Sequence, residues 1–173
     1  MTTDIPREPL TRSAEDYLKA IYHLTTGERS ATTNELAQAL DLAPASVSGM
    51  VRRLSEQGLV EHEPYRGVTL APEGRRVALR MLRRHRLIEA YLVAHLGYTW
   101  DTVHDEAERL EHAVSETLVE RMAKVLGDPQ EDPHGDPIPD SHGALDRREY
   151  DTLLTCPLGS AVTVTRVIDQ DSA

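Results

Sequence analysis

The order of three helical patterns followed by two short strands, within the first 70 residues, most constrains the fold of this 173-residue chain. Apolar residues recur at helical spacing after Ser13, which is followed by acidic residues typical of a helix start. A second helix is predicted to begin at Thr32 or Thr33, where Glu35 completes a capping pattern. Pro44 stands at the first position of a third helix, and Gly58 ends it. The first helix is expected to run from Ser13 until Gly27 ends it, and the other two cover residues 33–40 and 45–57.

The short connector between the second and third helices indicates a helix-turn-helix. Small residues at the start of the third helix would let it lie deep in a major groove, with serine hydroxyls and arginines available for base edges and phosphates. An ordinary helical bundle segment is the alternative interpretation of this pattern. The candidate DNA contacts in and beside this motif are Thr33, Pro44, Ala45, Ser46, Ser48, Gly49, Arg52 and Arg53.

A two-stranded hairpin is predicted directly after the third helix. Residues 59–63 and 68–70 have the composition of strands, and the residues between them are typical of a turn, with Gly67 supplying a permissive backbone. Arg66 would lie at its tip, within reach of a phosphate or a minor groove. Three helices and a hairpin in this order predict a winged helix.

The second half of the chain carries further helical patterns. A long arginine-rich helix is expected over residues 71–95, another from about Thr99 or Asp101, and another over residues 115–126. Their apolar faces exceed what one small monomer needs, so we expect a homodimer, which a palindromic DNA site would also require.

The stretch HDEAERLEH, residues 104–112, indicates a metal site. As a helix it places two imidazoles and two carboxylates, from His104, Glu108, Glu111 and His112, on one side. These donors suit Mn(II), Fe(II) and Zn(II). A solvated acidic face is the alternative interpretation. His85 and Glu89 also share a helix face, a pair that alone is more typical of a surface contact.

Charge is distributed unevenly along the chain. Residues 1–90 hold 13 lysines and arginines against 12 acidic residues, whereas residues 91–173 hold 6 against 17. The near-neutral half can approach DNA, and the acidic half can bind cations. The absence of a long apolar run, a secretory signal and a second cysteine besides Cys156 predicts a cytoplasmic protein without a membrane span.

The composition changes after Gly127. Residues 128–143 are rich in proline, glycine and aspartate, which predicts a loop, and we expect His134 and His142 there to be surface residues. Residues 161–168 predict one β-strand, which either pairs with a strand elsewhere in the chain or begins a further small β domain.

Several motifs occur in the order of one known family: EDYLKAIYHL, VSGMVRRLSEQGLV, RGVTLAPEGR, RRHRLIE, VHDEAERLEH and DPHGDPIP. Over residues 13–140 the chain resembles the diphtheria-toxin-repressor family of metal-dependent transcriptional regulators. The resemblance implies a mainly α fold, with an N-terminal winged helix-turn-helix, an all-helical dimerisation domain and a truncated C-terminal β segment. The domains expected are residues 1–72 for DNA binding, 73–140 for metal binding and dimerisation, and 141–173 for a linker and the start of an incomplete SH3-like domain.

The same resemblance implies two metal sites. The primary ligands fall on Asp16, Glu108, Glu111 and His112, with Asp16 and Glu108 as in the manganese-responsive branch rather than the sulfur donors of the iron-responsive branch. The ancillary ligands fall on His85, Glu89 and His104. Lys19 occupies a position that is acidic in members with a close metal pair, so we expect two separated sites.

These expectations describe a Mn(II)-activated dimeric repressor of metal-uptake genes that binds a palindromic operator, with no small organic substrate. A bound ion would join the two domains and hold the recognition helices about 34 Å apart. An Fe(II)-responsive regulator of the same family is the alternative, and Zn(II), Co(II) or Cd(II) would serve as substitutes in vitro. A metalloenzyme is disfavoured because no nucleophile, phosphate loop or separate general base stands out. A regulator with an organic effector would leave the His/Glu cluster unexplained.

Overall fold

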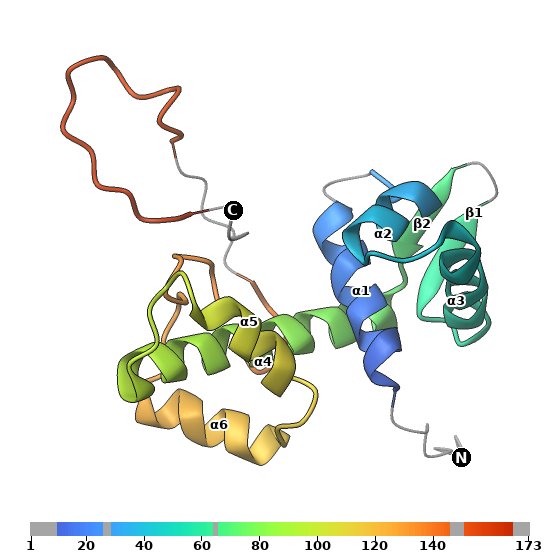
Figure 1. Cartoon of the computed structure of the whole chain (residues 1–173), viewed down its shortest axis with the longest axis horizontal. Helices are drawn as coiled ribbons and strands as arrows, with labels where there is room; N and C mark the ends of the chain where they lie inside the picture. Colours follow the sequence, from blue (N-terminus) through green and yellow to red (C-terminus); the bar gives the residue numbers. More distant parts are fainter. Residues whose placement is uncertain (1–9, 26–28, 64–65, 146–150, 168–173) are drawn as a thin grey trace. The chain divides into compact units, whose positions relative to one another are not determined.

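The structure is a computed structural model that describes residues 10–25, 29–63, 66–145 and 151–167. It divides into two compact units, residues 1–81 and 82–173, with the boundary inside one helix after Met81. Figure 1 labels the elements, and each unit is described separately below.

The first unit contains the predicted three helices and hairpin. The helices are α1 (Arg12–Leu24), α2 (Thr33–Ala39) and α3 (Pro44–Glu56), and the antiparallel strands are β1 (Val60–Glu63) and β2 (Gly67–Leu70). Thr32 caps α2 and forms the predicted capping box with Glu35, while Pro44 is the first residue of α3. The winged-helix prediction is therefore confirmed, although Pro64 and Tyr65 at the expected turn lie outside the described residues.

The base of the wing is held by a short third segment. Ala31 pairs with Val68 of β2 through two backbone hydrogen bonds of 2.9 and 2.8 Å. Gly67 has a φ of +102°, and a Cβ atom there would lie 2.5 Å from the carbonyl oxygen of Ala31. Glycine is required at this position, because no side chain fits between the strand and residue 31.

The core of the first unit is apolar and continuous. Fully buried side chains from α1, α2, α3, both strands and the first turns of the following helix pack together. Among them are Leu18, Ile21, Leu36, Val47 and Leu54. Each falls at the helical spacing that the sequence predicts, so the inward face of α3 is fixed and its opposite face is exposed.

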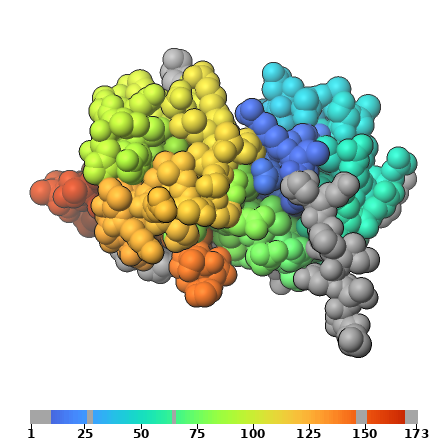
Figure 2. Space-filling view, turned by 90° about the horizontal axis from the view of Figure 1, so that it is seen from below, coloured from blue at the N-terminus to red at the C-terminus, as the bar shows by residue number. Residues whose placement is uncertain are grey.

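The second unit is built on helices, as expected. Helix α4 (Pro72–Leu96) supplies its last four turns, followed by α5 (Val103–Leu110) and α6 (Glu116–Val125). Val103 and Ala107 of α5 are fully buried against Ile88 and Leu92, which confirms the apolar face predicted for this helix. The atoms of α5 and α6, yellow to orange in Figure 2, form a continuous surface on the visible face of this unit.

Two expectations for the C-terminal half are wrong. Helix α5 ends at Leu110, so Glu111 is its C-cap and His112 lies in the following turn rather than within the helix. Residues 161–167 form no strand, and residue 168 lies outside the described residues. A lone strand lacks a hydrogen-bonding partner, which explains why the β-favouring sequence does not adopt this form here. Among the described residues, no helix is both long and apolar enough to cross a membrane.

Candidate metal centre

The candidate metal centre of the second unit is built on two side chains one turn apart on α4. His85 and Glu89 are 6% and 1% exposed, so the interpretation of this pair as a surface contact is wrong. A buried histidine and a buried carboxylate need partners that compensate for lost hydration. Those partners come from α5 and from the turn that follows it.

The imidazole of His85 lies between two carboxylates. Its Nδ1 atom is 2.6 Å from Oε2 of Glu111, and its Nε2 atom is 3.0 Å from Oε1 of Glu89. His104, on the first turn of α5, brings its Nδ1 atom to 3.1 Å from the same Oε1 atom of Glu89. Two imidazoles therefore converge on one carboxylate oxygen, and the predicted ancillary ligands His85, Glu89 and His104 do lie together.

The residues at the end of α5 belong to the same cluster. Glu111 is fully buried, and Arg84 fixes its backbone by donating to its carbonyl oxygen at 2.9 Å. Nε2 of His112 lies 3.3 Å from Oε1 of Glu111. Glu108 is half-buried, 3.8 Å from both His85 and His104. Because Glu111 has no solvent exposure, the interpretation of this stretch as a solvated acidic face is wrong for Glu111.

Opposite charges stabilise this centre without an ion. Burial disfavours protonation of His85, but the hydrogen bonds that its ring donates to Glu111 and Glu89 outweigh burial and raise its pKa to about 9. Burial likewise favours the neutral form of Glu89, yet hydrogen bonds with His104 and His85 lower its pKa to about 2. A protonated His85 therefore supplies positive charge between two carboxylates at neutral pH.

Two further residues of the centre were missed by the sequence analysis. His134 is 4% exposed rather than a surface residue, whereas His142 is exposed as expected. His134 donates from Nε2 to the carbonyl oxygen of Trp100 at 2.6 Å, which turns its Nδ1 atom toward Oε2 of Glu89, 3.7 Å away. Asp132 lies beside them, and burial raises its pKa to about 6.

A turn, not a helix, positions these two residues. Oδ1 of Asp132 accepts hydrogen bonds from the backbone N–H groups of His134 (2.8 Å) and Asp136 (2.9 Å). The sequence does carry a signal for this turn, because an aspartate such as Asp132, followed three residues later by a glycine such as Gly135, is typical of turns in which the aspartate side chain accepts hydrogen bonds from the backbone. Helical spacing alone does not reveal such a turn.

The donor atoms fit a divalent cation. Ligand atoms of His85, His104 and Glu108 lie within 4.8 Å of one another, as do those of Glu89, Asp132 and His134. Oε2 of Glu89 and Nδ1 of His134 are buried and have no hydrogen-bond partner among the described residues. Imidazole nitrogen and carboxylate oxygen are the donors that Mn(II), Fe(II) and Zn(II) accept in proteins.

Asp16 is a half-buried residue of α1 in the first unit. Its role as a primary ligand with Glu108, Glu111 and His112 stays a prediction.

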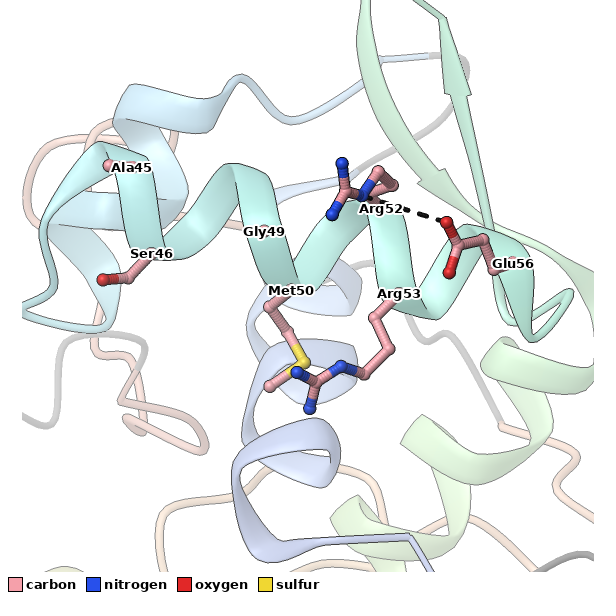
Figure 3. A pocket seen from close by; sticks show the side chains of 7 residues that line it. All are labelled: Ala45, Ser46, Gly49, Met50, Arg52, Arg53 and Glu56. Atoms are coloured by element: carbon pink, nitrogen blue, oxygen red, sulfur yellow. Dashed lines mark ion pairs between the residues drawn. The ribbon is translucent and has the colours of Figure 1, made fainter.

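The candidate DNA contacts of α3 lie on the exposed face of that helix. Figure 3 shows a shallow pocket on it, lined by Ala45, Ser46, Gly49, Met50, Arg52, Arg53 and Glu56. Ser48 donates to the carbonyl oxygen of Pro44 at 3.0 Å, so its hydroxyl bonds to the helix itself.

Two further candidate DNA contacts lie outside α3. Arg66 pairs with Glu63 across the wing at 3.2 Å, and Thr33 is the half-buried first residue of α2.

A winged helix in one unit and a buried histidine–carboxylate centre in the other are together typical of a metal-responsive DNA-binding regulator. The comparisons with known proteins agree. Residues 9–68 match the model of the iron-dependent repressor N-terminal DNA-binding domain, and residues 71–140 match that of the iron-dependent repressor metal-binding and dimerisation domain.

Individual relatives point to the same class. The regulator MntR of Lysinibacillus sphaericus is 33% identical over 123 residues, covering 71% of this chain and 88% of MntR. The iron-dependent repressor IdeR of Mycobacterium tuberculosis is 38% identical over 124 residues, covering 72% of this chain but 54% of IdeR. A solved manganese-dependent transcriptional repressor in complex with manganese superposes with a TM-score of 0.82 at 47% identity, covering 91% of this chain and 73% of that one.

The chain therefore belongs to the diphtheria-toxin-repressor family of metal-dependent transcriptional regulators. It combines the DNA-binding and dimerisation domains of a repressor, and the matched domains and relatives are transcriptional repressors rather than enzymes. Both manganese and iron occur in the names of the relatives.

Proposed function

We propose that this chain is a Mn(II)-activated repressor that binds a palindromic operator as a homodimer and controls metal-uptake genes. The observation that carries this proposal is the donor set of the centre, which consists of imidazoles and carboxylates within its described residues. The one cysteine of the chain, Cys156, lies in the segment 151–167. A hard oxygen and nitrogen site of this kind disfavours softer metals.

The proposed ligands fall into two sets. The primary set is Asp16, Glu108, Glu111 and His112, and the ancillary set is His85, Glu89 and His104, which we extend to Asp132 and His134. Asp16, Glu108, Glu111 and His112 would hold a divalent cation, which would supply the positive charge that their carboxylates need. His85 connects the two sets, because it bonds to Glu111 through one ring nitrogen and to Glu89 through the other.

The chain's own residues prepare the centre for a cation. Arg84 holds the backbone of Glu111, and the Trp100 carbonyl holds the ring of His134 in the tautomer that leaves Nδ1 available as a ligand. Protonated His85 occupies the position of positive charge in the metal-free chain. Release of that proton frees one ring nitrogen of His85, while the other keeps its N–H and its hydrogen bond to a carboxylate.

An Fe(II)-responsive regulator is the second candidate, since IdeR is among the relatives. Affinity for N/O sites rises from Mn(II) to Fe(II) and on to Zn(II), so selectivity must come from coordination number and metal supply. Anaerobic titrations of DNA binding with Mn(II) and Fe(II), compared with the free concentration of each ion, separate the two candidates.

Metal dependence is tested by DNA binding with chelator and then with each divalent ion added back. We expect Mn(II) to restore binding of the full chain to a palindromic operator. The Asp16→Ala variant should stay a folded dimer and lose most of this stimulation, whereas Asp105→Ala, an exposed acid of α5, should keep it. Metal stimulation of Asp16→Ala equal to that of the parent chain would overturn the proposed primary site.

A further inference from the structure

Gly49 lies in the middle of α3, and nothing in the described protein requires a glycine there. Its backbone is helical, and it is not among the glycines that need a positive φ. A Cβ atom at this position would meet no atom within 4 Å. Glycine destabilises a helix interior relative to alanine, so the folded chain gains no stability from this residue. We therefore expect its role to involve a binding partner that approaches the exposed face of α3.

The surface around Gly49 is a notch whose apolar part is formed by Ala45 and Met50, and whose rim carries Ser46, Arg52, Arg53 and Glu56. Ala45 lies one turn before it, and Met50 lies beside it, half-buried at the edge of the core. In Figure 3 the side chains of Met50 and Arg53 extend on the same side of the helix, while Arg52 pairs with Glu56 at 3.8 Å. The positive rim suits a DNA backbone, and the missing side chain lets another surface approach the helix closely.

The chemistry of the major groove says which group the notch fits. A polar side chain at the centre of a recognition helix reads bases by hydrogen bonds, and position 49 has none. Thymine alone presents an apolar group in the major groove, its 5-methyl, which pairs with aliphatic side chains. The thioether side chain of Met50 is flexible and polarisable, and therefore adapts to such a group.

We propose that Gly49 and Met50 are specificity-determining residues, and that the notch between them takes the 5-methyl group of one thymine in each operator half-site. Gly49 supplies the space, and Met50 supplies the apolar contact. This inference rests on the DNA-binding role of the chain and adds the group that α3 reads.

The test begins with selection of binding duplexes from a random pool by the full chain with Mn(II). Each thymine of the selected site is then replaced by deoxyuridine, which removes only the methyl group. We expect the parent chain to lose affinity about fourfold at one thymine per half-site, as burial of one methyl group predicts. In Met50→Ala, the ratio of affinities for thymine and uracil at that position should fall close to one.

The Gly49→Ala variant separates DNA reading from folding. Its Tm should equal or exceed that of the parent, because alanine favours the helix, while its affinity for the selected site should fall about tenfold. Ser55→Ala, on the same helix outside the pocket, is the matched control and should keep the parent's affinity.

The outcomes distinguish this inference from the proposed function. One outcome is selection of a specific duplex in which no thymine is sensitive to loss of its methyl group and to which Gly49→Ala binds as tightly as the parent. That result would contradict the proposed thymine contact, but it would leave the proposed metal-activated repressor unaffected. If no divalent ion supports selection of a specific duplex, both the proposed function and the proposed thymine contact are contradicted.

Discussion

The Nδ1 atom of His85 lies 2.6 Å from Oε2 of Glu111, a residue 26 positions later in the chain. This contact joins α4 to the end of α5 inside a buried site. It also connects the two sets of ligands that the sequence predicts as separate, because the other ring nitrogen of His85 bonds to Glu89. The protonation of one histidine is therefore coupled to both sets.

The metal-free chain should lose stability as the pH rises from about 6.5 to about 9. The pKa of His85 is raised to about 9, above its ordinary value of 6.5, so its stabilising contribution is complete below pH 6.5. That contribution is lost as the pH passes through the folded pKa. Thermal unfolding of chelator-treated protein between pH 6 and 9.5 measures this, and a Tm that rises over the window would contradict it. His85→Gln should flatten the dependence.

Arg86 should be essential to the stability of the turn that carries Asp132 and His134. Its guanidinium lies 3.5 Å from Asp132 and 3.5 Å from Asp136, and it donates to the carbonyl oxygen of Pro137 at 2.5 Å. Removing it leaves a buried carboxylate without its cation, so Arg86→Ala should lower the free energy of unfolding by about 3–5 kcal/mol.

Urea unfolding measures this loss, and the matched control is an exposed arginine. Arg109→Ala removes an ion pair with Glu106 on the surface of α5 and should cost less than about 1 kcal/mol. Equal losses in the two arginine variants would show that burial of the Arg86 pair contributes nothing.

Gly135→Ala should release residues 165–167 from the same turn. Gly135 has a φ of +82°, and a Cβ atom there would lie 1.8 Å from the carbonyl oxygen of Thr165. The backbone N–H of Val167, which donates to the carbonyl oxygen of His134 at 2.8 Å, should then lose its protection from hydrogen exchange. Gly159→Ala has the same φ of +82° with open space around the added atom, and it should leave the protection of Val167 unchanged.

Arg66→Ala should weaken DNA binding without changing the preferred sequence. Arg66 lies on the wing beside Glu63, and a phosphate contact from it would carry no base information. The slope of log affinity against log salt concentration should fall by about one, and all duplexes should weaken alike. A changed sequence preference in a repeated selection would instead assign Arg66 to a groove.

Sequence patterns predicted the helices and the hairpin, and they placed some residues of the candidate metal centre on shared helix faces, because burial follows helical spacing within single elements. Val103 and Ala107 face inward as that spacing requires, and His85 shares a face with Glu89. Helical spacing did not predict the burial of residues whose position depends on a turn. His134 is buried because Asp132 shapes the loop around it, and helix α5 ends one residue before Glu111.

Contacts between distant segments were also beyond prediction from a single sequence. Nothing in the spacing of His85 and Glu111 indicates that they touch, since that depends on the packing of α4 against the chain after α5. The resemblance to a known family brought both residues into one list of ligands, but it did not indicate their direct hydrogen bond.

The pairing of Ala31 with Val68 gives the wing a second attachment besides its own two strands. The hairpin is therefore anchored at its root by a segment that precedes the recognition helix. A substitution at Arg66, between Glu63 and Gly67, should therefore change contacts with DNA without changing the position of α3 in its own unit. Exchanging Arg66 while keeping residues 31 and 68 should accordingly adjust the affinity for DNA at an unchanged operator.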